Sequence, residues 1–177
     1  MEKIKYENRI FYVYKHDGKV AKICHGVKDH KEKYIKKMAK FLSKTVNEDC
    51  FIIPIPQHSG KAEYTLETAL KIKEMKKRKF NIEILDVLEC DPHISLYDQK
   101  KAIKEKGKFL TKEQIKNLDI GNLRLKKDFD KNTIEGKSVF FLDNVMTTGT
   151  TFKNCLSLIP DAKPLIFAIS SFYFRNN

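Results

Sequence analysis

The sequence predicts an α/β fold, a mostly parallel sheet flanked by helices, and two observations lead to this prediction. First, short apolar segments such as Cys50–Ile55 and Ser138–Leu142 alternate with longer segments whose apolar residues recur at helical spacing. This alternation is typical of a parallel sheet covered on both faces. Second, the chain has 177 residues, 41% of them hydrophobic, without repeats or low-complexity linkers, so we expect one globular domain over residues 1–177.

The amino-terminal segment predicts a β-hairpin. Residues Arg9–Tyr14 have an alternating pattern, and an Asp17-Gly18 turn separates them from Val20–Ile23. Over His30–Val46 the apolar residues recur at helical spacing with lysines on the opposite face, which predicts a helix. The Ile-rich run Cys50–Ile55 then predicts a buried strand.

The remaining elements are predicted from the same two periods. We expect helices at Lys61–Arg78, near Gln99–Lys106, at Lys112–Leu118 and at Thr151–Leu158, and strands at Asn81–Leu88, Ser138–Leu142 and Pro164–Phe174. The stretch from Asp91 to Lys137 is the least regular part of the chain. The predicted order is therefore hairpin, helix–strand–helix–strand, an irregular segment, and strand–helix–strand.

The formal net charge of +12 favours anionic partners, because a basic protein attracts phosphorylated metabolites and nucleic acids alike. The lysines gather in Lys31–Lys44, Lys71–Lys79 and Lys100–Lys108, between apolar positions at helical spacing. Solvated helix faces give the same pattern, so charge alone does not separate a metabolite enzyme from a nucleic-acid binder. The sequence has no zinc finger, RNA-recognition aromatic motif or helix-turn-helix glycine pattern.

The four cysteines, Cys24, Cys50, Cys90 and Cys155, are widely spaced and include no close pair. Zinc ribbons and redox dithiols require two cysteines a few residues apart, so we expect reduced thiols rather than zinc or disulfides. No apolar run has the length of a signal peptide or a transmembrane helix. We therefore expect a soluble, cytoplasmic protein without membrane contact.

The segment Val139–Thr151 predicts a phosphate-binding site. A buried strand leads through Asp143 and Asn144 into a loop with four threonines around one glycine, and a helix follows. Ligands bind beyond the carboxyl ends of the strands in open α/β sheets. Backbone N–H groups, hydroxyls and a helix N-terminus suit a phosphate, and Gly149 permits the positive φ that such a loop needs. A capping turn without a ligand is the alternative, but a cap needs only one hydroxyl.

This segment resembles the motif with which type I phosphoribosyltransferases bind phosphoribosyl pyrophosphate (PRPP). That motif is a hydrophobic strand, two acids, two aliphatic residues and Thr-Thr-Gly-x-Thr. The matching positions are Asp143, Val145, Met146, Thr147, Thr148, Gly149 and Thr151. The resemblance implies a phosphoribosyltransferase-like fold with a small hood, and ribose hydroxyls bound by Asp143. It implies a 5-phosphate held by Thr147, Thr148, Gly149, Thr150 and Thr151.

Asn144 departs from the family pattern, because most active members have a second acid at this position. An amide still forms hydrogen bonds with hydroxyl groups, but it brings no negative charge. The family's transition states carry positive charge on the ribose, so a missing carboxylate removes electrostatic stabilisation. We assign Asp143 and Asn144 to the catalytic position, and the departure leaves open a protein that binds PRPP without turnover.

The resemblance also implies a pyrophosphate-binding loop after an earlier strand. The candidate is Pro54–Lys61, in which Ser59 and Gly60 offer N–H groups and Lys61 offers a positive charge near the start of a helix. An ordinary strand-to-helix connection has the same composition. The Pro-Ile-Pro start resembles the competence-factor (ComF-like) branch of the family, whose N-terminal zinc ribbon is missing here.

Two further parts of the family fold have candidates in the sequence. His93–Gly107 occupies the place of the flexible loop that closes over PRPP, and its groups that would approach pyrophosphate are Ser95, Lys100, Lys101 and Lys104. The hood that stacks on a base is either the hairpin within residues 1–28 or the aromatic segment Phe172–Phe174. A sheet edge is the alternative position for the hairpin.

The resemblance implies an enzyme of nucleotide metabolism, a glycosyltransferase that uses PRPP and magnesium. Ribose 5-phosphate would pass to, or from, a small nitrogenous base with release of pyrophosphate, and Mg²⁺ would bind through PRPP rather than through protein ligands. The alternative is a non-catalytic regulatory protein that binds PRPP or a nucleotide 5-phosphate, and the +12 charge would suit its association with nucleic acid. Homodimers are common in the family. The acceptor base is not identified by the sequence.

Overall fold

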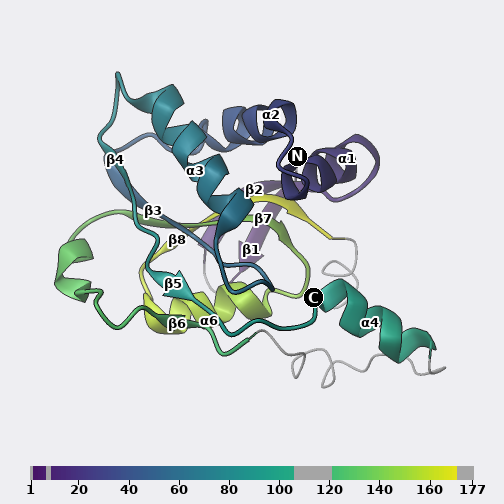
Figure 1. The fold of residues 1–177 in the computed structure, drawn as a ribbon. Helices are drawn as coiled ribbons and strands as arrows, with labels where there is room; N and C mark the ends of the chain where they lie inside the picture. Colours follow the sequence, from purple (N-terminus) through teal and green to yellow (C-terminus); the bar gives the residue numbers. More distant parts are fainter. Residues whose placement is uncertain (1, 7–8, 106–120, 171–177) are drawn as a thin grey trace.

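The fold is built on one six-stranded sheet with helices on both faces (Figure 1). The computed structural model describes residues 2–6, 9–105 and 121–170. The strand order is β1-β2-β8-β7-β3-β4, in which five strands are parallel and β1 pairs antiparallel with β2 at one edge. The predicted α/β class, with a mostly parallel sheet flanked by helices, is confirmed.

The described elements fall into a main sheet, a small ribbon and a set of helices. The sheet contains β1 (Glu2–Tyr6), β2 (Arg9–Lys15), β3 (Cys50–Pro54), β4 (Ile82–Ile84), β7 (Val139–Met146) and β8 (Lys163–Ile169). A separate antiparallel ribbon contains β5 (Leu88–Glu89) and β6 (Arg124–Leu125). The helices are α1 (Gly18–Lys28), α2 (Glu32–Leu42), α3 (Glu63–Lys76), α4 (Leu96–Glu105), the 3-10 turn η1 (Lys131–Ile134) and α6 (Thr150–Leu158).

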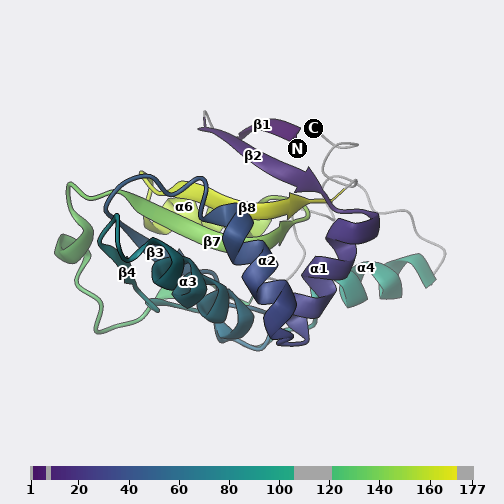
Figure 2. The same cartoon turned by 90° about the horizontal axis from the view of Figure 1, so that it is seen from above.

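Two hydrophobic cores lie on opposite faces of the sheet. Helices α1, α2 and α3 cover one face, and α6 with the β5–β6 ribbon covers the other (Figures 1 and 2). Successive side chains of a strand point to opposite faces, so Phe140 packs under α1–α3 whereas Phe141 packs against the α6 side. Strands buried on both faces need no polar alternation, which explains their continuous apolar sequences.

The residues predicted as the second arm of the hairpin form a helix instead. The hairpin consists of β1 and β2, and the Asp17-Gly18 turn leads into α1. Cys24 and Val27 are buried in the core shared with α2 and the sheet, and Val20 packs against it. These positions recur at helical spacing, but the window Val20–Ile23 is too short to distinguish this period from that of a strand.

Other differences concern the limits of elements. β7 continues to Met146 instead of ending at Leu142, α6 begins one residue early at Thr150, and the predicted strand Asn81–Leu88 is divided between β4 and β5. The predicted helix near Gln99–Lys106 corresponds to α4. The predicted helix Lys112–Leu118 and the hood candidate Phe172–Phe174 lie outside the described residues.

The direction of strand addition reverses between β3 and β7. From β3 the chain passes through α3 to β4 on one side, and from β7 it passes through α6 to β8 on the other side. Helices α3 and α6 cover opposite faces of the sheet. The loops after β3 and after β7 therefore leave adjacent parallel strands at a topological switch point, the place where open α/β sheets bind ligands.

Candidate functional site

Strand β7 continues beyond the point at which its pairing with β3 ends. The pairing of β3 with β7 ends at Pro54 and Leu142, and the Ile55 N–H donates to the Leu142 carbonyl at 3.0 Å. On its other side β7 remains paired with β8 as far as Met146 and Ile169. Asp143 and Asn144 therefore lie inside a strand rather than after it, with one side of that strand released from β3.

The threonine loop connects this strand to α6. Gly149 stands at the helix N-cap with φ of 81° and gives no side-chain cap. The Thr148 hydroxyl donates to Thr150 Oγ1 at 3.0 Å and accepts from the Thr150 N–H at 3.3 Å. Thr147, Thr148, Thr150 and Thr151 are each half-buried. The free N–H groups of a helix N-terminus, with hydroxyls around them, form a favourable site for an anion.

The end of β8 fixes the start of this loop. The Ser170 N–H donates to the Met146 carbonyl at 3.0 Å, and the Ser170 hydroxyl donates to the Thr147 carbonyl at 3.2 Å. Met146 itself is buried in the α6-side core. The loop is thus held in place by hydrogen bonds and packing on its strand side, whereas its threonines remain partly exposed.

Asp143 is a half-buried carboxyl group immediately before the loop. Its Oδ1 accepts from the Asn144 backbone N–H at 2.7 Å. Burial raises the pKa of Asp143 to about 6, against smaller lowering effects from the Asn144 N–H and from the positive charge of Lys28. The group is ionised at neutral pH in a poorly solvated environment, and such perturbed carboxyl groups are typical of functional sites.

Asn144, the next residue of β7, is buried and 3% exposed. Its Nδ2 group forms no hydrogen bond with the described residues. The phenol of Tyr64, at the start of α3, lies near this amide but not in standard hydrogen-bond geometry. A buried donor without a partner costs about 1–3 kcal/mol, so the amide would gain from an acceptor atom supplied by a ligand or by water.

Two N–H groups of the loop after β3 already donate within the loop. The Gln57 N–H donates to the Lys61 carbonyl at 3.0 Å, and the Gly60 N–H donates to the Gln57 carbonyl at 2.9 Å. The Gln57 side-chain oxygen, when turned toward α3, accepts from the Glu63 and Tyr64 N–H groups at 3.0 and 2.9 Å. The Gly60 N–H expected to bind pyrophosphate is therefore already donated within the loop.

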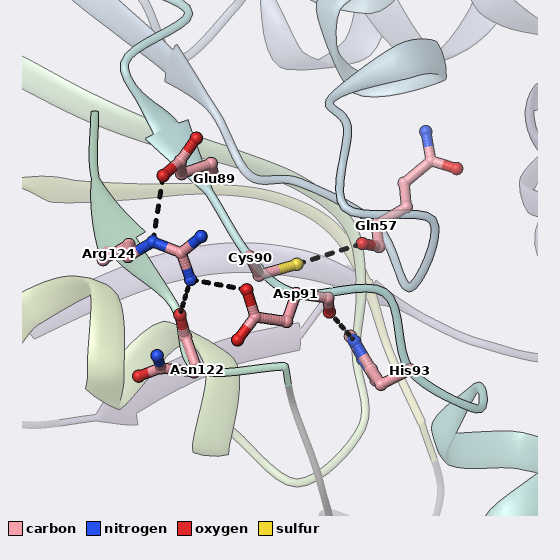
Figure 3. Close-up of polar contacts among 7 residues, drawn as sticks. All are labelled: Gln57, Glu89, Cys90, Asp91, His93, Asn122 and Arg124. Atoms are coloured by element: carbon pink, nitrogen blue, oxygen red, sulfur yellow. Dashed lines mark hydrogen bonds and ion pairs between the residues drawn. The ribbon is translucent and has the colours of Figure 1, made fainter. Parts of the chain in front are cut away.

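This loop is also fixed to the segment that follows β5, as Figure 3 shows. The Cys90 thiol donates to the Gln57 carbonyl at 3.2 Å, and the His93 N–H donates to the His58 carbonyl at 2.9 Å. Gly60 has φ of 89°, and a Cβ atom at this residue would lie 2.7 Å from the Cys90 carbonyl oxygen. Only glycine fits this close approach of two backbones without strain.

Arg124 of β6 stabilises the segment that follows β5. Its guanidinium donates to Glu89 at 2.9 Å and to Asp91 at 2.7 Å (Figure 3), and the hydrogen bond from Arg124, with a smaller contribution from its charge, lowers the pKa of Asp91. Ser59 and Lys61, the other two residues predicted to bind pyrophosphate, are exposed at the tip of the loop. The two side chains face solvent and are free to meet a ligand that approaches the carboxyl edge.

The start of α4 holds the first of the predicted closing groups. Ser95 caps this helix: its hydroxyl accepts from the Asp98 N–H at 3.2 Å and donates to the Asp98 carboxylate at 2.5 Å. Lys101 is exposed, with Glu105 at 3.8 Å. The side chains of Lys100 and Lys104 lie outside what the structure describes.

Helix α1 supplies residues that the sequence analysis did not assign to the site. The charge of Lys28, in its last turn, acts on Asp143, and the charge of Asp143 in turn acts on the Cys24 thiol. Burial, with a smaller contribution from Asp143, raises the pKa of Cys24 to about 12, so this thiol is protonated. The signal for these residues is the helical spacing of Val20, Cys24 and Val27, which the hairpin prediction obscured.

Comparisons with known proteins add no relative. Neither a scan against protein-family models nor a search of curated proteins finds a match to this chain. In residues 2–6, 9–105 and 121–170, no helix is long and apolar enough to cross a membrane. Over the same ranges, no group of three or more His, Cys, Asp or Glu side chains could hold a metal ion. The four cysteines all lie in the described ranges, are buried and form no disulfide there.

Proposed function

We propose that the chain binds PRPP at the carboxyl edge of its sheet and acts as a phosphoribosyltransferase of type I. The observation that carries this proposal is the position of Thr147–Thr151. These threonines and the positive-φ Gly149 form the entry to α6 at the switch point, and they follow the strand β7 that holds the half-buried Asp143. A phosphate would take the N–H groups and hydroxyls of this loop, and Asp143 would accept hydrogen bonds from the ribose hydroxyls.

In the proposed reaction a nitrogen atom of the base attacks C1 of the ribose. The bond between C1 and the pyrophosphate oxygen breaks, its electron pair leaves with pyrophosphate, and the base releases a proton to solvent. Asp143 is placed to stabilise positive charge on the ribose, because a poorly solvated carboxylate interacts strongly with charge. Mg²⁺, when bound with PRPP, would neutralise the leaving pyrophosphate. Lys61 is exposed on the neighbouring loop and would add positive charge there.

Calorimetric titration with PRPP and Mg²⁺ tests the ligand. We expect saturable binding that Thr148→Asp weakens by about 100-fold or more, because like charges brought together cost several kcal/mol. Ser157→Asp is the matched control, since it adds the same charge to an exposed residue in the last turn of α6, away from the threonine loop. An equal loss in both variants, or no binding to the folded wild type, would reject the proposed site.

A specific observation favours a second function, that of a binding protein without turnover. Asn144 stands where active relatives of the resembled family have an acid, and its buried Nδ2 lacks a partner. This amide suits a ligand acceptor atom but supplies no negative charge to a transition state. Such a protein would retain PRPP or nucleotide binding, with a possible regulatory output.

Measuring pyrophosphate release from PRPP with a panel of nitrogenous bases separates the two functions. An enzyme gives release with the wild type on at least one base. A regulator gives none, and its Asn144→Asp variant is expected to gain release while PRPP binding persists. If the wild type releases pyrophosphate and Asn144→Asp does not increase the rate, the amide is the catalytic choice of this chain and the regulatory reading is wrong.

A further inference from the structure

Two of the three lysine-rich segments of the chain lie on α2, α3 and the residues that follow them, and the third is Lys100–Lys108. Residues 31–44 contain six lysines and one glutamate, and residues 71–79 contain six lysine or arginine residues and one glutamate. The contrast is the region around the β5–β6 ribbon. Residues 82–98 and 121–137 together contain five basic and eight acidic residues. The excess charge is therefore local and does not cover the whole surface evenly.

These two basic segments form one surface, here called the α2–α3 surface. The helices lie side by side on the same face of the sheet, and both Figure 1 and Figure 2 show this arrangement. A groove of about 340 Å³ runs between them, lined by Lys36, Lys37, Lys40, Lys71, Glu74 and Met75. Met75 is 43% exposed, so the groove has an apolar residue among its lysines.

A second hollow lies at the end of α3 and continues the same surface. It measures about 420 Å³, and its cations are Lys73, Lys77, Arg78 and Lys79. Its single carboxylate, Asp49, already accepts from the Asn81 N–H at 2.8 Å. Both hollows thus border on α3, and both are lined mainly by positive charge.

Several of these cations have no anionic partner. Lys36 pairs with Glu32 at 2.6 Å and Lys71 pairs with Glu74 at 2.5 Å. Within the described part of the chain, no ion pair is formed by six others: Lys37, Lys40, Lys73, Lys77, Arg78 and Lys79. Unpaired cations repel one another, so a polyanion would relieve that repulsion on binding.

The surface is separate from the proposed PRPP site. The second hollow includes Ile82 and lies where β3 and β4 begin, at the opposite end of α3 from the loop after β3. Helix α3 has 14 residues, which corresponds to about 21 Å. One small metabolite cannot span this length, whereas a polymer with phosphates at regular intervals can.

The kind of side chain indicates how such a polymer would be bound. Lysine meets a phosphate as a point charge, and only one arginine offers a fork for bidentate recognition. Lysines lie over the two half-buried aromatic rings of this surface, with Lys33 Nζ 5.0 Å from the centre of the Tyr34 ring and Lys76 Nζ 5.3 Å from the centre of the Phe80 ring. These lysines compete for the ring faces on which unpaired bases would stack, which favours a paired duplex.

We propose that the α2–α3 surface binds double-stranded nucleic acid through its phosphodiester backbone, without selecting a base sequence. This inference is independent of the proposed phosphoribosyltransferase function. Fluorescence anisotropy with a labelled duplex of 20 base pairs tests it, in DNA and RNA forms of one sequence and in a second, scrambled sequence. We expect similar affinities for both sequences and a linear fall of log K with log salt concentration. The duplex that binds with the higher affinity, DNA or RNA, identifies the natural ligand.

The decisive variant is Lys40→Gln/Lys73→Gln/Lys77→Gln, whose three residues are exposed. The matched control is Lys127→Gln/Lys131→Gln/Lys137→Gln, which removes the same charge from exposed residues near the β5–β6 ribbon. We expect the α2–α3 variant to bind about tenfold more weakly or worse and to reduce the salt slope by about three, one per lost phosphate contact. The control should change affinity less than the α2–α3 variant and keep its salt slope.

Three results would overturn the proposal. Equal losses in the two variants would show that net charge alone attracts the duplex. Absence of salt-dependent binding by the wild type would show that the α2–α3 surface does not bind nucleic acid. Tighter binding to a polyglutamate peptide than to either duplex would assign the surface to an acidic protein partner instead. Circular dichroism melts of both variants ensure that loss of folding is not mistaken for loss of contacts. If the triple variant unfolds, the single variant Lys73→Gln gives the same test with a smaller change of charge.

Discussion

The loops after β3 and β7 leave adjacent parallel strands, yet they differ in how far their polar groups are hydrogen-bonded within the protein. The β3 loop uses its Gln57 and Gly60 N–H groups internally, caps α3 with the Gln57 side chain and is hydrogen-bonded to Cys90 and His93. The β7 loop enters α6 through a glycine that provides no cap, and its threonine hydroxyls interact with one another. The first loop is a rigid support, and the second has groups left for a ligand.

This difference implies that the two loops are not equally suited to bind an anion. For the β7 loop an anion would replace weak contacts between threonines with charge-assisted hydrogen bonds. For the β3 loop an anion that takes the Gly60 N–H must first break the turn closed by the Gln57 carbonyl. We therefore expect Ser59 and Lys61 to contribute through exposed side chains, and Thr147–Thr151 to contribute most of the binding.

The largest expected effect on stability concerns the rigidity of the β3 loop. Gly60→Ala places a Cβ atom 2.7 Å from the Cys90 carbonyl oxygen at a residue with positive φ, so we expect a loss of about 3 kcal/mol in the free energy of unfolding. Urea denaturation measures it. The control is Gly136→Ala, which has φ of 67° but nothing within 4 Å of the added atom, and we expect it to lose about 1 kcal/mol. Equal losses would mean that the two segments do not constrain each other.

The next effect concerns the electrostatics of the β7 side. The pKa of Asp143 is raised to about 6, so its charged form destabilises the folded state, and Asp143→Asn should remove this cost. A shift of this size corresponds to about 3 kcal/mol, which partial exposure reduces to about 2 kcal/mol. Because the folded pKa is the higher one, the native state binds more protons between about pH 4 and pH 6. The advantage of the variant should therefore be complete above pH 6 and disappear as the pH falls to about 4.

Chemical denaturation of wild type and Asp143→Asn at pH 4, 6 and 8 measures this difference. The control is Asp128→Asn, which removes the same charge from an exposed aspartate in the turn after β6. If Asp143→Asn is less stable than the wild type at pH 8, the carboxylate is stabilised by contacts that outweigh its burial. The same variant should lose PRPP affinity, since a group that weakens folding is retained for the ligand under the proposed function.

The smallest effect concerns the cap of α3. Gln57→Ala removes the side-chain oxygen that meets the Glu63 and Tyr64 N–H groups, and we expect a loss of about 1 kcal/mol. Gln57→Glu keeps an acceptor and places a negative charge at the helix N-terminus, so it should retain or increase stability. Thermal unfolding followed by circular dichroism compares the two variants. A similar loss in both would show that the side chain packs without capping.

The sequence was sufficient for the class of fold, because strands buried on both faces have continuous apolar runs between amphipathic helices. It was also sufficient to place the threonine loop before a helix. It failed at α1, where a four-residue window and a plausible Asp17-Gly18 turn favoured a strand over the helix that tertiary packing selects. It failed at the end of β7 because Asp143 and Asn144 are polar, and only their pairing with β8 keeps them in the strand.

The contacts between the loop after β3 and the segment after β5 were not predictable from the sequence. The hydrogen bonds that attach the loop to Cys90 and His93 join residues more than 30 positions apart, and no local pattern records them. The influence of Lys28 on Asp143 depends on the docking of α1 over the carboxyl edge. Such contacts depend on long-range packing, and sequence periodicity reports only which residues share a face.

The position of β8 has a consequence for how the chain is made. The strand that separates β2 from β7 is the last one of the sheet, and the His16 N–H donates to the carbonyl of Ile169. During synthesis on the ribosome β2 is completed early, but the neighbour it needs is translated some 150 residues later. Pairing over such a separation is slow, because loop closure must precede the contacts that reward it. A nascent chain that has not yet released residues 163–169 therefore carries the β1–β2 hairpin with an open edge, and this is the stage at which binding by a chaperone would protect it most.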